Sequence, residues 1–289
     1  MKTSLFFAMF FAMTLGAMSQ IFYEVTDPAA PKAKMYLLGS IHVADSSFYP
    51  LDDKILVAFG ESEALVTEIK MDNMVETALM MQKKMMYGKS DSLRAHLADT
   101  TYDKVVKYFS KIGMGEGAIK RFSPAMVAVT LIQLSAMDEG LDAEYGIDKH
   151  FVEVATEYNK TQLGLETAES QVALLESMNR FENIDEMICG LIDNPDAISS
   201  VFDQMTTAWK AHDAEKLAEV INQDVHSPAE QKFNEQLLAV RNVNFCTEIK
   251  KLLAEGKIYF GIVGAGHLVG TASTIENLKK AGCKVKRIM

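Results

Sequence analysis

The sequence predicts an α/β fold: a mixed, mostly parallel sheet built from the N- and C-terminal segments, with a large helical insertion. Short runs rich in β-branched and aromatic residues lie near both ends of the 289-residue chain. The middle, from about 71 to 255, shows helical periodicity that one strand near 160–167 interrupts. No Pro- or Ser-rich linker divides the chain, so residues 20–289 are predicted to form one α/β domain with a helical cap.

The first 19 residues have the layout of a secretory signal peptide. Lys2 precedes an apolar stretch, and Ala17 and Ser19 form a small-residue cleavage pattern, so we predict a cut after Ser19. The apolar stretch is shorter than the about 20 residues that a membrane span needs, although an uncleaved N-terminal anchor is the alternative. No later stretch is long and apolar enough to span a membrane. The mature protein is therefore expected to be secreted or periplasmic.

The first strands and helix follow from local signals. "FYEVTD" (22–27) and "KMYLLGS" (34–40) read as two strands around the turn-rich "PAAPKA", which predicts a hairpin with a loop longer than the minimum. Apolar residues four apart predict a short helix within 49–62. "ALVTEIK" (64–70) is a further short strand.

The long middle of the chain is predicted to be helical on both sides of the strand "KTQLGLET" (160–167). Ser123 before Pro124 is a good helix start, because serine can cap a helix and proline suits its first position. "SPAE" (227–230) is a second start of this kind, a capping box. The chain is then predicted to close with a strand, a helix and a strand, at 257–264, 271–282 and 284–288.

The charge balance excludes one class of partner. The formal net charge is −10, and no cluster of Lys and Arg interleaved with aromatic residues offsets it. Such a chain repels phosphate backbones, so nucleic acid is not expected as a partner. The sequence leaves the oligomeric state open.

Two apolar strands end in the same pattern, Gly-x-x-His. His42 follows "YLLGSIH", His267 follows "FGIVGAGH", and Glu68 lies at the end of a third strand. The carboxyl ends of parallel strands meet at one edge of an α/β sheet, where such proteins place their sites. Two imidazoles and a carboxylate suit a divalent metal ion, whereas two unrelated loop histidines are the alternative. Three glycines, Gly39, Gly264 and Gly266, would allow the backbone to approach a ligand closely.

Arg241 is a charged residue at an apolar position. It follows Phe233 and Leu237 at four-residue steps, so it emerges on the apolar face of its helix. A charge on that face needs a partner. The partner could be a substrate group or a structural acid. Asp148, at the start of another helix, is expected either to cap that helix or to join a site.

The whole pattern resembles the TraB/GumN family, which also includes the Tiki proteases. The stretches "YLLGSIHVADSSFYPL", "SEALVTEI", "LGLETAESQVALL", "RNVNFCTEIKKLL" and "GIVGAGHLVG" occur in the order typical of this family. The resemblance implies an extracellular or periplasmic α/β domain with His42 and His267 at one site. It also implies that Arg241 and Asn242 belong to this site, and Glu166 could reach the same sheet edge.

Metal-dependent peptidase activity is attributed to the Tiki proteases, so the resemblance and the site residues together imply an exported metal-dependent hydrolase. Its expected substrate is a peptide or a small molecule, and a peptidase is the leading hypothesis. His42, His267 and Glu68 would hold a divalent ion such as Zn, Mn or Co, or Glu68 would act as general base. Arg241 and Asn242 would orient the substrate or hold its oxyanion. The alternative is a non-catalytic periplasmic or extracellular binding protein that sequesters a peptide or haem, because a histidine on such a loop can also ligate haem.

Overall fold

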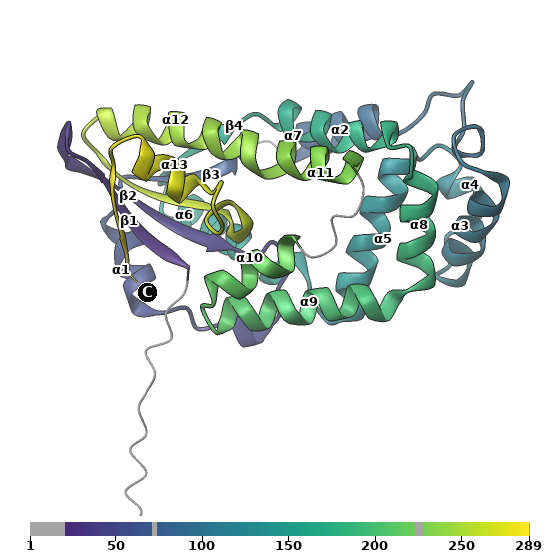
Figure 1. Cartoon of the computed structure of the whole chain (residues 1–289), viewed down its shortest axis with the longest axis horizontal. Helices are drawn as coiled ribbons and strands as arrows, with labels where there is room; N and C mark the ends of the chain where they lie inside the picture. The colour runs from purple at the N-terminus through teal and green to yellow at the C-terminus, as the bar shows by residue number, and fades with distance from the viewer. Residues whose placement is uncertain (1–20, 71–73, 223–227, 289) are drawn as a thin grey trace, which may run out of the picture.

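A six-stranded mixed sheet forms one end of the molecule and a helical insertion forms the other (Figure 1). The computed structural model describes residues 21–70, 74–222 and 228–288. The order of the strands across the sheet is β4-β3-β5-β2-β1-β6. The strands are β1 (Phe22–Asp27), β2 (Ala30–Ser40), β3 (Ala64–Ile69), β4 (Thr161–Glu166), β5 (Ile258–Gly264) and β6 (Lys284–Arg287).

The helices come mostly from the middle of the chain. The α-helices are α1 (Asp53–Glu61), α2 (Met74–Met85), α3 (Asp99–Lys111), α4 (Glu116–Ile119), α5 (Pro124–Asp138), α6 (Ile147–Glu157), α7 (Ala168–Ser177), α8 (Ile184–Asp193), α9 (Pro195–Lys210), α10 (Ala214–Asn222), α11 (Pro228–Asn234), α12 (Arg241–Ala254) and α13 (Thr274–Lys280). The 3₁₀ segments are η1 (Ser46–Phe48), η3 (Leu93–Ala95), η4 (Ala143–Tyr145), η5 (Met178–Arg180) and η7 (Ala265–His267), and η6 (Glu235–Val240) is a π-helix.

The sheet confirms the predicted fold class. β2 and β3 pair in parallel with β5 on either side, and β4 extends the parallel part beyond β3. β1 pairs antiparallel with both β2 and β6. Ser40 at the end of β2 lies opposite Gly264 at the end of β5. The carboxyl ends of β2, β3 and β5 therefore open onto the same edge of the sheet.

The hairpin at the start of the chain differs from the prediction. Asp27 pairs with Ala30, so the loop has only two residues, and "PAAPKA" is mostly strand rather than loop. Pro31 signalled a turn, but it lies before the part of β2 that pairs with β5, which begins at Lys34. Because proline has no N–H, it cannot donate a hydrogen bond to a neighbouring strand, but at this position no bond to β5 is needed. The prediction of a longer loop was therefore wrong.

Other local predictions are confirmed within the described residues. α1 occupies the predicted range, and the Ser123 side chain caps α5 by accepting from the backbone N–H of Met126. The signal peptide at 1–19 and the first residue of the capping box, Ser227, lie outside the described residues. In the part of the chain that the structure describes, no helix is long and apolar enough to cross a membrane.

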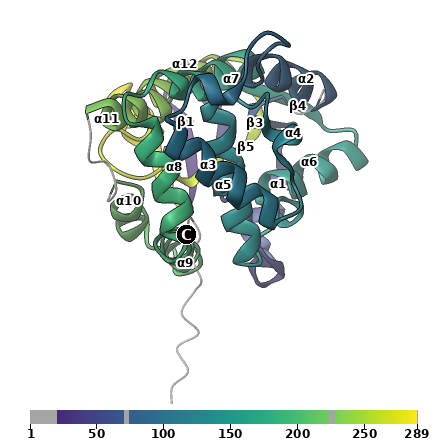
Figure 2. The same cartoon turned by 90° about the vertical axis from the view of Figure 1, so that its right-hand side faces the viewer.

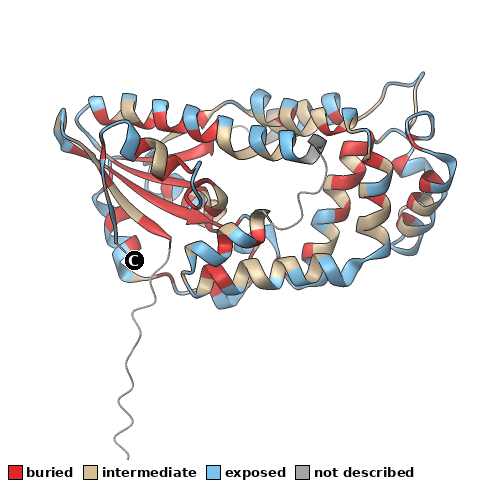
Figure 3. Ribbon diagram, viewed as in Figure 1, coloured by how far each residue is buried: buried red, intermediate tan, exposed pale blue. Residues whose placement is uncertain are grey.

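Helices pack against the sheet, and the hydrophobic core lies between them and the strands, most of whose residues are buried (Figure 3). α12 packs against β1, β2 and β4, whereas α1 contacts β2 and β5, and α6 contacts β3 and β4. Phe59, Phe151 and Phe260 join α1, α6 and β5 through ring contacts. Both α6 and α12 fall inside the range predicted for the cap, yet they belong to the sheet layer because their apolar faces are buried there.

A second hydrophobic core lies in the rest of the insertion. Leu93, Tyr102, Phe109, Leu131 and Ile188 are buried in it, and they come from η3, α3, α5 and α8. Figure 2 views the molecule from this end, with α3, α5 and α8 in front of the sheet. The insertion thus has a hydrophobic core of its own, separate from the core beside the sheet.

Trp209 at the end of α9 links the insertion to the sheet. It is only 1% exposed, and its ring lies tilted against that of Phe48, with 5.0 Å between the centroids. Its Nε1–H donates to the carbonyl of Gly39 at 2.8 Å. A Cβ on Gly39 would lie 3.1 Å from the backbone of Ala265. Glycine therefore lets β2 lie close to the segment that carries His267.

Replacing the buried indole should destabilise the fold. Trp209→Ala is expected to lower the free energy of unfolding by about 3–5 kcal/mol, because it leaves a cavity and an unpaired carbonyl. Chemical denaturation followed by circular dichroism measures this. Tyr158→Ala, at a side chain that is 71% exposed, is the matched control and should change the value by less than about 0.5 kcal/mol. Equal effects of the two variants would contradict this role of Trp209.

Candidate functional site

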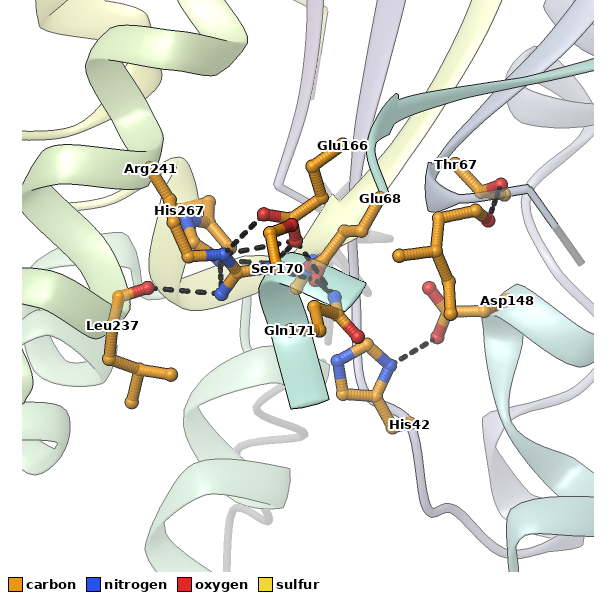
Figure 4. A network of polar contacts seen from close by, with 12 residues as sticks. His42, Thr67, Glu68, Asp148, Glu166, Ser170, Gln171, Leu237, Arg241 and His267 are labelled. Atoms are coloured by element: carbon orange, nitrogen blue, oxygen red, sulfur yellow. Dashed lines mark hydrogen bonds and ion pairs between the residues drawn. The ribbon is translucent and has the colours of Figure 1, made fainter. Parts of the chain in front are cut away.

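Side chains from three strand ends converge at the carboxyl edge of the sheet (Figure 4). His42 follows β2 by two residues, Glu68 is near the end of β3, and His267 ends η7 directly after β5. A Cβ built on Gly264 would lie 3.3 Å from Glu68 Oε1, 3.4 Å from His42 Nε2 and 3.8 Å from His267 Cδ2. The three side chains therefore surround one point, and glycine at 264 keeps that point open.

Glu68 is held as a buried carboxylate. Its Oε1 accepts from the backbone N–H of Gly264 at 2.7 Å, and its Oε2 accepts from Arg241 at 2.6 Å and from Gln171 at 2.9 Å. Burial alone would raise the pKa of Glu68, but the charges of His42 and Arg241 and the bond from the Gly264 N–H lower it to about 2. Glu68 is therefore ionised at neutral pH.

Arg241 lies at the centre of the buried charges. Its Nε donates to Glu166, its Nη2 to both Glu68 and Glu166, and its Nη1 to the Leu237 carbonyl and to His267 Nε2, both at 3.0 Å. All five N–H donors of the guanidinium are used. Burial opposes its charge, but the two carboxylates raise the pKa of Arg241 above its ordinary value. The structure thus supplies the partner that this apolar position requires.

The helix that carries Arg241 is irregular just before it. η6 is a π-helical segment over Glu235–Val240, and such segments are frequent at functional sites. The Leu237 carbonyl in η6 accepts the bond from Arg241 Nη1. The irregular turn thereby takes part in orienting the guanidinium.

Asn242 fixes the orientation of His267. Its Nδ2 donates to the Ala272 carbonyl, so its Oδ1 faces His267 Nδ1 at 2.7 Å and also accepts from Thr274. Because an amide oxygen only accepts, His267 carries its proton on Nδ1 and directs the Nε2 lone pair towards Arg241 and Glu68. Burial lowers the pKa of His267 to about 4, although the Glu68 charge opposes the shift. His267 is therefore neutral at pH 7.

His42 is oriented in a similar way by an acidic residue on α6. Its Nδ1 is 2.8 Å from Asp148 Oδ2, and the other oxygen of Asp148 accepts from the Ser40 hydroxyl. The Asp148 carboxylate raises the pKa of His42 to about 9. The His42 side chain is 63% exposed, whereas that of His267 is 4% exposed. The site therefore opens to solvent on the His42 side.

All seven predicted polar site residues lie in this cluster or directly beside it. Glu166 at the end of β4 bonds to Arg241, and Gln171 on α7 donates to both Glu68 and Glu166. Of the predicted glycines, Gly266 lies away from the cluster, facing Ile221 and Leu238. Sequence reasoning missed Gln171, Ser40 and Thr274. Gln171 stands one turn after Thr167, which caps α7, so its proximity to the strand end was the one available signal.

The orientation of the two histidines suits a divalent metal ion, but one hydrogen bond of His267 does not. Both imidazoles direct Nε2 inward while an oxygen atom holds Nδ1, which is the usual arrangement of metal-binding histidines. Arg241 Nη1, however, donates to His267 Nε2. Among the described residues no group of three or more His, Cys, Asp or Glu side chains is arranged to hold a metal ion. A cation at this point would have to replace the bond from Arg241 to His267.

Fold and site together define an α/β protein with a histidine and carboxylate centre at the carboxyl edge of its sheet. The chain belongs to the TraB/PrgY/gumN family, whose model matches residues 21–287. It is similar to an uncharacterized protein of Treponema pallidum (strain Nichols), with 22% identity over 90% of this chain and 80% of that protein. It is also similar to the uncharacterized protein YbaP of Escherichia coli (strain K12), with 21% identity over 84% and 87% of the two chains. No solved structure matches the chain.

Removing the guanidinium should destabilise the protein strongly. Arg241→Met leaves the buried carboxylate of Glu68 and the mostly buried one of Glu166 without their cation, so we expect the free energy of unfolding to fall by roughly 3–5 kcal/mol. Adding Glu68→Gln and Glu166→Gln to this variant should restore much of the loss, because the unpaired charges are then gone. Chemical denaturation of both variants measures the effect.

The matched control is Lys279→Met, which removes an exposed ion pair with Glu276. It should cost less than about 1 kcal/mol. If Arg241→Met were no more destabilising than this control, the buried cluster would not have the structural importance assigned to it.

Proposed function

We propose that the protein is an exported metal-dependent hydrolase that acts on peptides. One observation carries the proposal: the side chains of His42, Glu68 and His267 surround one point beside Gly264, while Asp148 and Asn242 hold the Nδ1 atoms of the two histidines. Two histidines and one carboxylate are a ligand set of catalytic zinc sites. The position at the carboxyl edge of the sheet also supports the proposal. Export rests on the signal-like segment at residues 1–19.

In this proposal, His42 and His267 are metal ligands and Glu68 is the third ligand or the general base. A bound divalent ion would act as a Lewis acid towards a peptide carbonyl and would make water a better nucleophile near neutral pH. Glu68 is ionised and can accept a proton or donate a lone pair. His267 is already neutral, whereas His42 must release a proton before its Nε2 can bind a cation.

The remaining residues would position this centre. Asn242 is 2% exposed and uses its side chain on His267, Thr274 and Ala272, so it would act through His267 rather than on the substrate. Arg241 would keep Glu68 and Glu166 in place. It could reach a substrate oxyanion only by exchanging one of its present bonds, and the bond to His267 Nε2 is the one that a cation must also replace.

Metal binding tests the proposal directly. Isothermal titration with Zn²⁺ or Mn²⁺ should show one strong site in the wild-type protein, and His42→Ala and His267→Ala should each abolish it. Asn242→Ala should weaken it by about 10–100-fold, because the tautomer of His267 is then no longer fixed. His96→Ala removes an exposed histidine that pairs with Asp91, and as the matched control it should bind metal normally.

Cleavage of a mixed peptide library, read by mass spectrometry, should require the metal and both histidines. Full metal binding in both alanine variants would refute the proposed ligands. A Soret band on addition of haemin, without metal-dependent cleavage, would instead favour the non-catalytic binding protein.

A further inference from the structure

A groove runs from the charged cluster along α7 into the insertion. Its larger part has a volume of about 630 Å³ and lies between β4 and α7 on one side and η6 and α12 on the other. A smaller part of about 210 Å³ continues between η5 and α11, and Ser177 and Gln236 line both parts. Figures 1 and 2 both show α7 and α12 along the same side of the molecule.

At one end, the groove borders the proposed active centre. Glu166 and Arg241, which bond to each other, line it there. Beyond them the lining is mixed: Leu174 and Val240 are apolar, and Val240 is 49% exposed. Ser170, Asn244 and Thr247 add polar groups that a peptide backbone could use. A groove that alternates in this way suits an extended chain rather than a compact apolar ligand.

The far end combines two cations with two aromatic rings. Phe181 and Phe233 contact edge to face at 5.2 Å between centroids, and Arg180 and Lys232 flank them. Neither cation has a hydrogen bond or ion pair among the described residues. In the part of the chain that the structure describes, this end of the groove therefore offers positive charge beside an apolar surface.

The length of the groove sets the length of the chain that fits it. Lys232 and Arg241 are nine residues apart along the continuous path of α11, η6 and α12. At about 1.5 Å per residue, this is roughly 13 Å. An extended peptide covers that distance with about four residues at about 3.3 Å each.

We propose that this groove binds the C-terminal segment of an extended peptide, with its free carboxylate between Arg180 and Lys232. The smaller part of the groove has room for one side chain. The last residue of the peptide would therefore place both of its groups there: its carboxylate between the two cations and an apolar side chain against Phe181 and Phe233. The peptide then runs about four residues back to Glu166 and Arg241. That the bound peptide is then cleaved rests on the proposed function, whereas binding of the peptide in the groove needs no metal ion.

Fluorescence anisotropy with two labelled pentapeptides tests this inference. Both have alanine at positions one to four and leucine at position five, and a fluorophore at the N-terminus. One has a free C-terminal carboxylate and the other a C-terminal amide. The full chain should bind the free acid at least about ten-fold more tightly than the amide. Arg180→Ala with Lys232→Ala should remove this preference without changing the affinity for the amide.

The control double variant is Lys107→Ala with Lys111→Ala, which removes the same net charge from α3 and lines neither part of the groove. It should keep the preference for the free acid. Equal binding of acid and amide by the wild-type protein, no binding of either, or an unchanged preference in the Arg180 and Lys232 variant would overturn the inference. Metal titration of the same variant should match wild type, so failure of the metal centre and failure of the groove are distinguishable.

Discussion

The buried Arg241 guanidinium is the constraint on which the rest of the site depends. It uses its five N–H donors on Glu68, Glu166, the Leu237 carbonyl and His267 Nε2. Without it, the carboxylates of Glu68 and Glu166, at the ends of β3 and β4, would lie close together with no cation between them. One cation from α12 thus ties together two strand ends and the histidine that follows a third.

The sheet and the insertion contribute in different ways. The strand ends carry the side chains that could act chemically, namely His42, Glu68 and His267. The helices carry the groups that orient them: Asp148 on α6 holds His42, and Asn242 on α12 holds His267. The insertion also supplies the groove that leads away from the cluster. The proposed chemistry and the proposed peptide binding therefore both depend on how the helices of the insertion are placed beside the sheet.

The sequence predicted the parts of the fold and site that depend on strand ends and helix faces. His42, Glu68 and His267 could be placed together because parallel strands end at one edge. The apolar helix position of Arg241 predicted only that its charge has a partner, and the family resemblance placed it at the site. Ser40 and Thr274 could not be predicted, because short polar residues gain their roles only from tertiary packing, and Gln171 had no signal beyond its position close to the end of a strand. Tertiary packing also decides which helices belong to the cap. Periodicity shows that α6 and α12 have apolar faces, but it does not show that these faces pack against the sheet, so both helices were included in the predicted cap.

The most direct test of the central claim is anomalous diffraction from crystals of the full protein grown with Zn²⁺, collected at the zinc absorption edge. A bound ion should appear beside Gly264, in contact with Nε2 of His42 and His267 and with Glu68, and Arg241 should have given up its bond to His267. Zinc that is absent or bound elsewhere, with His267 Nε2 still accepting from Arg241, would contradict a metal centre at this site.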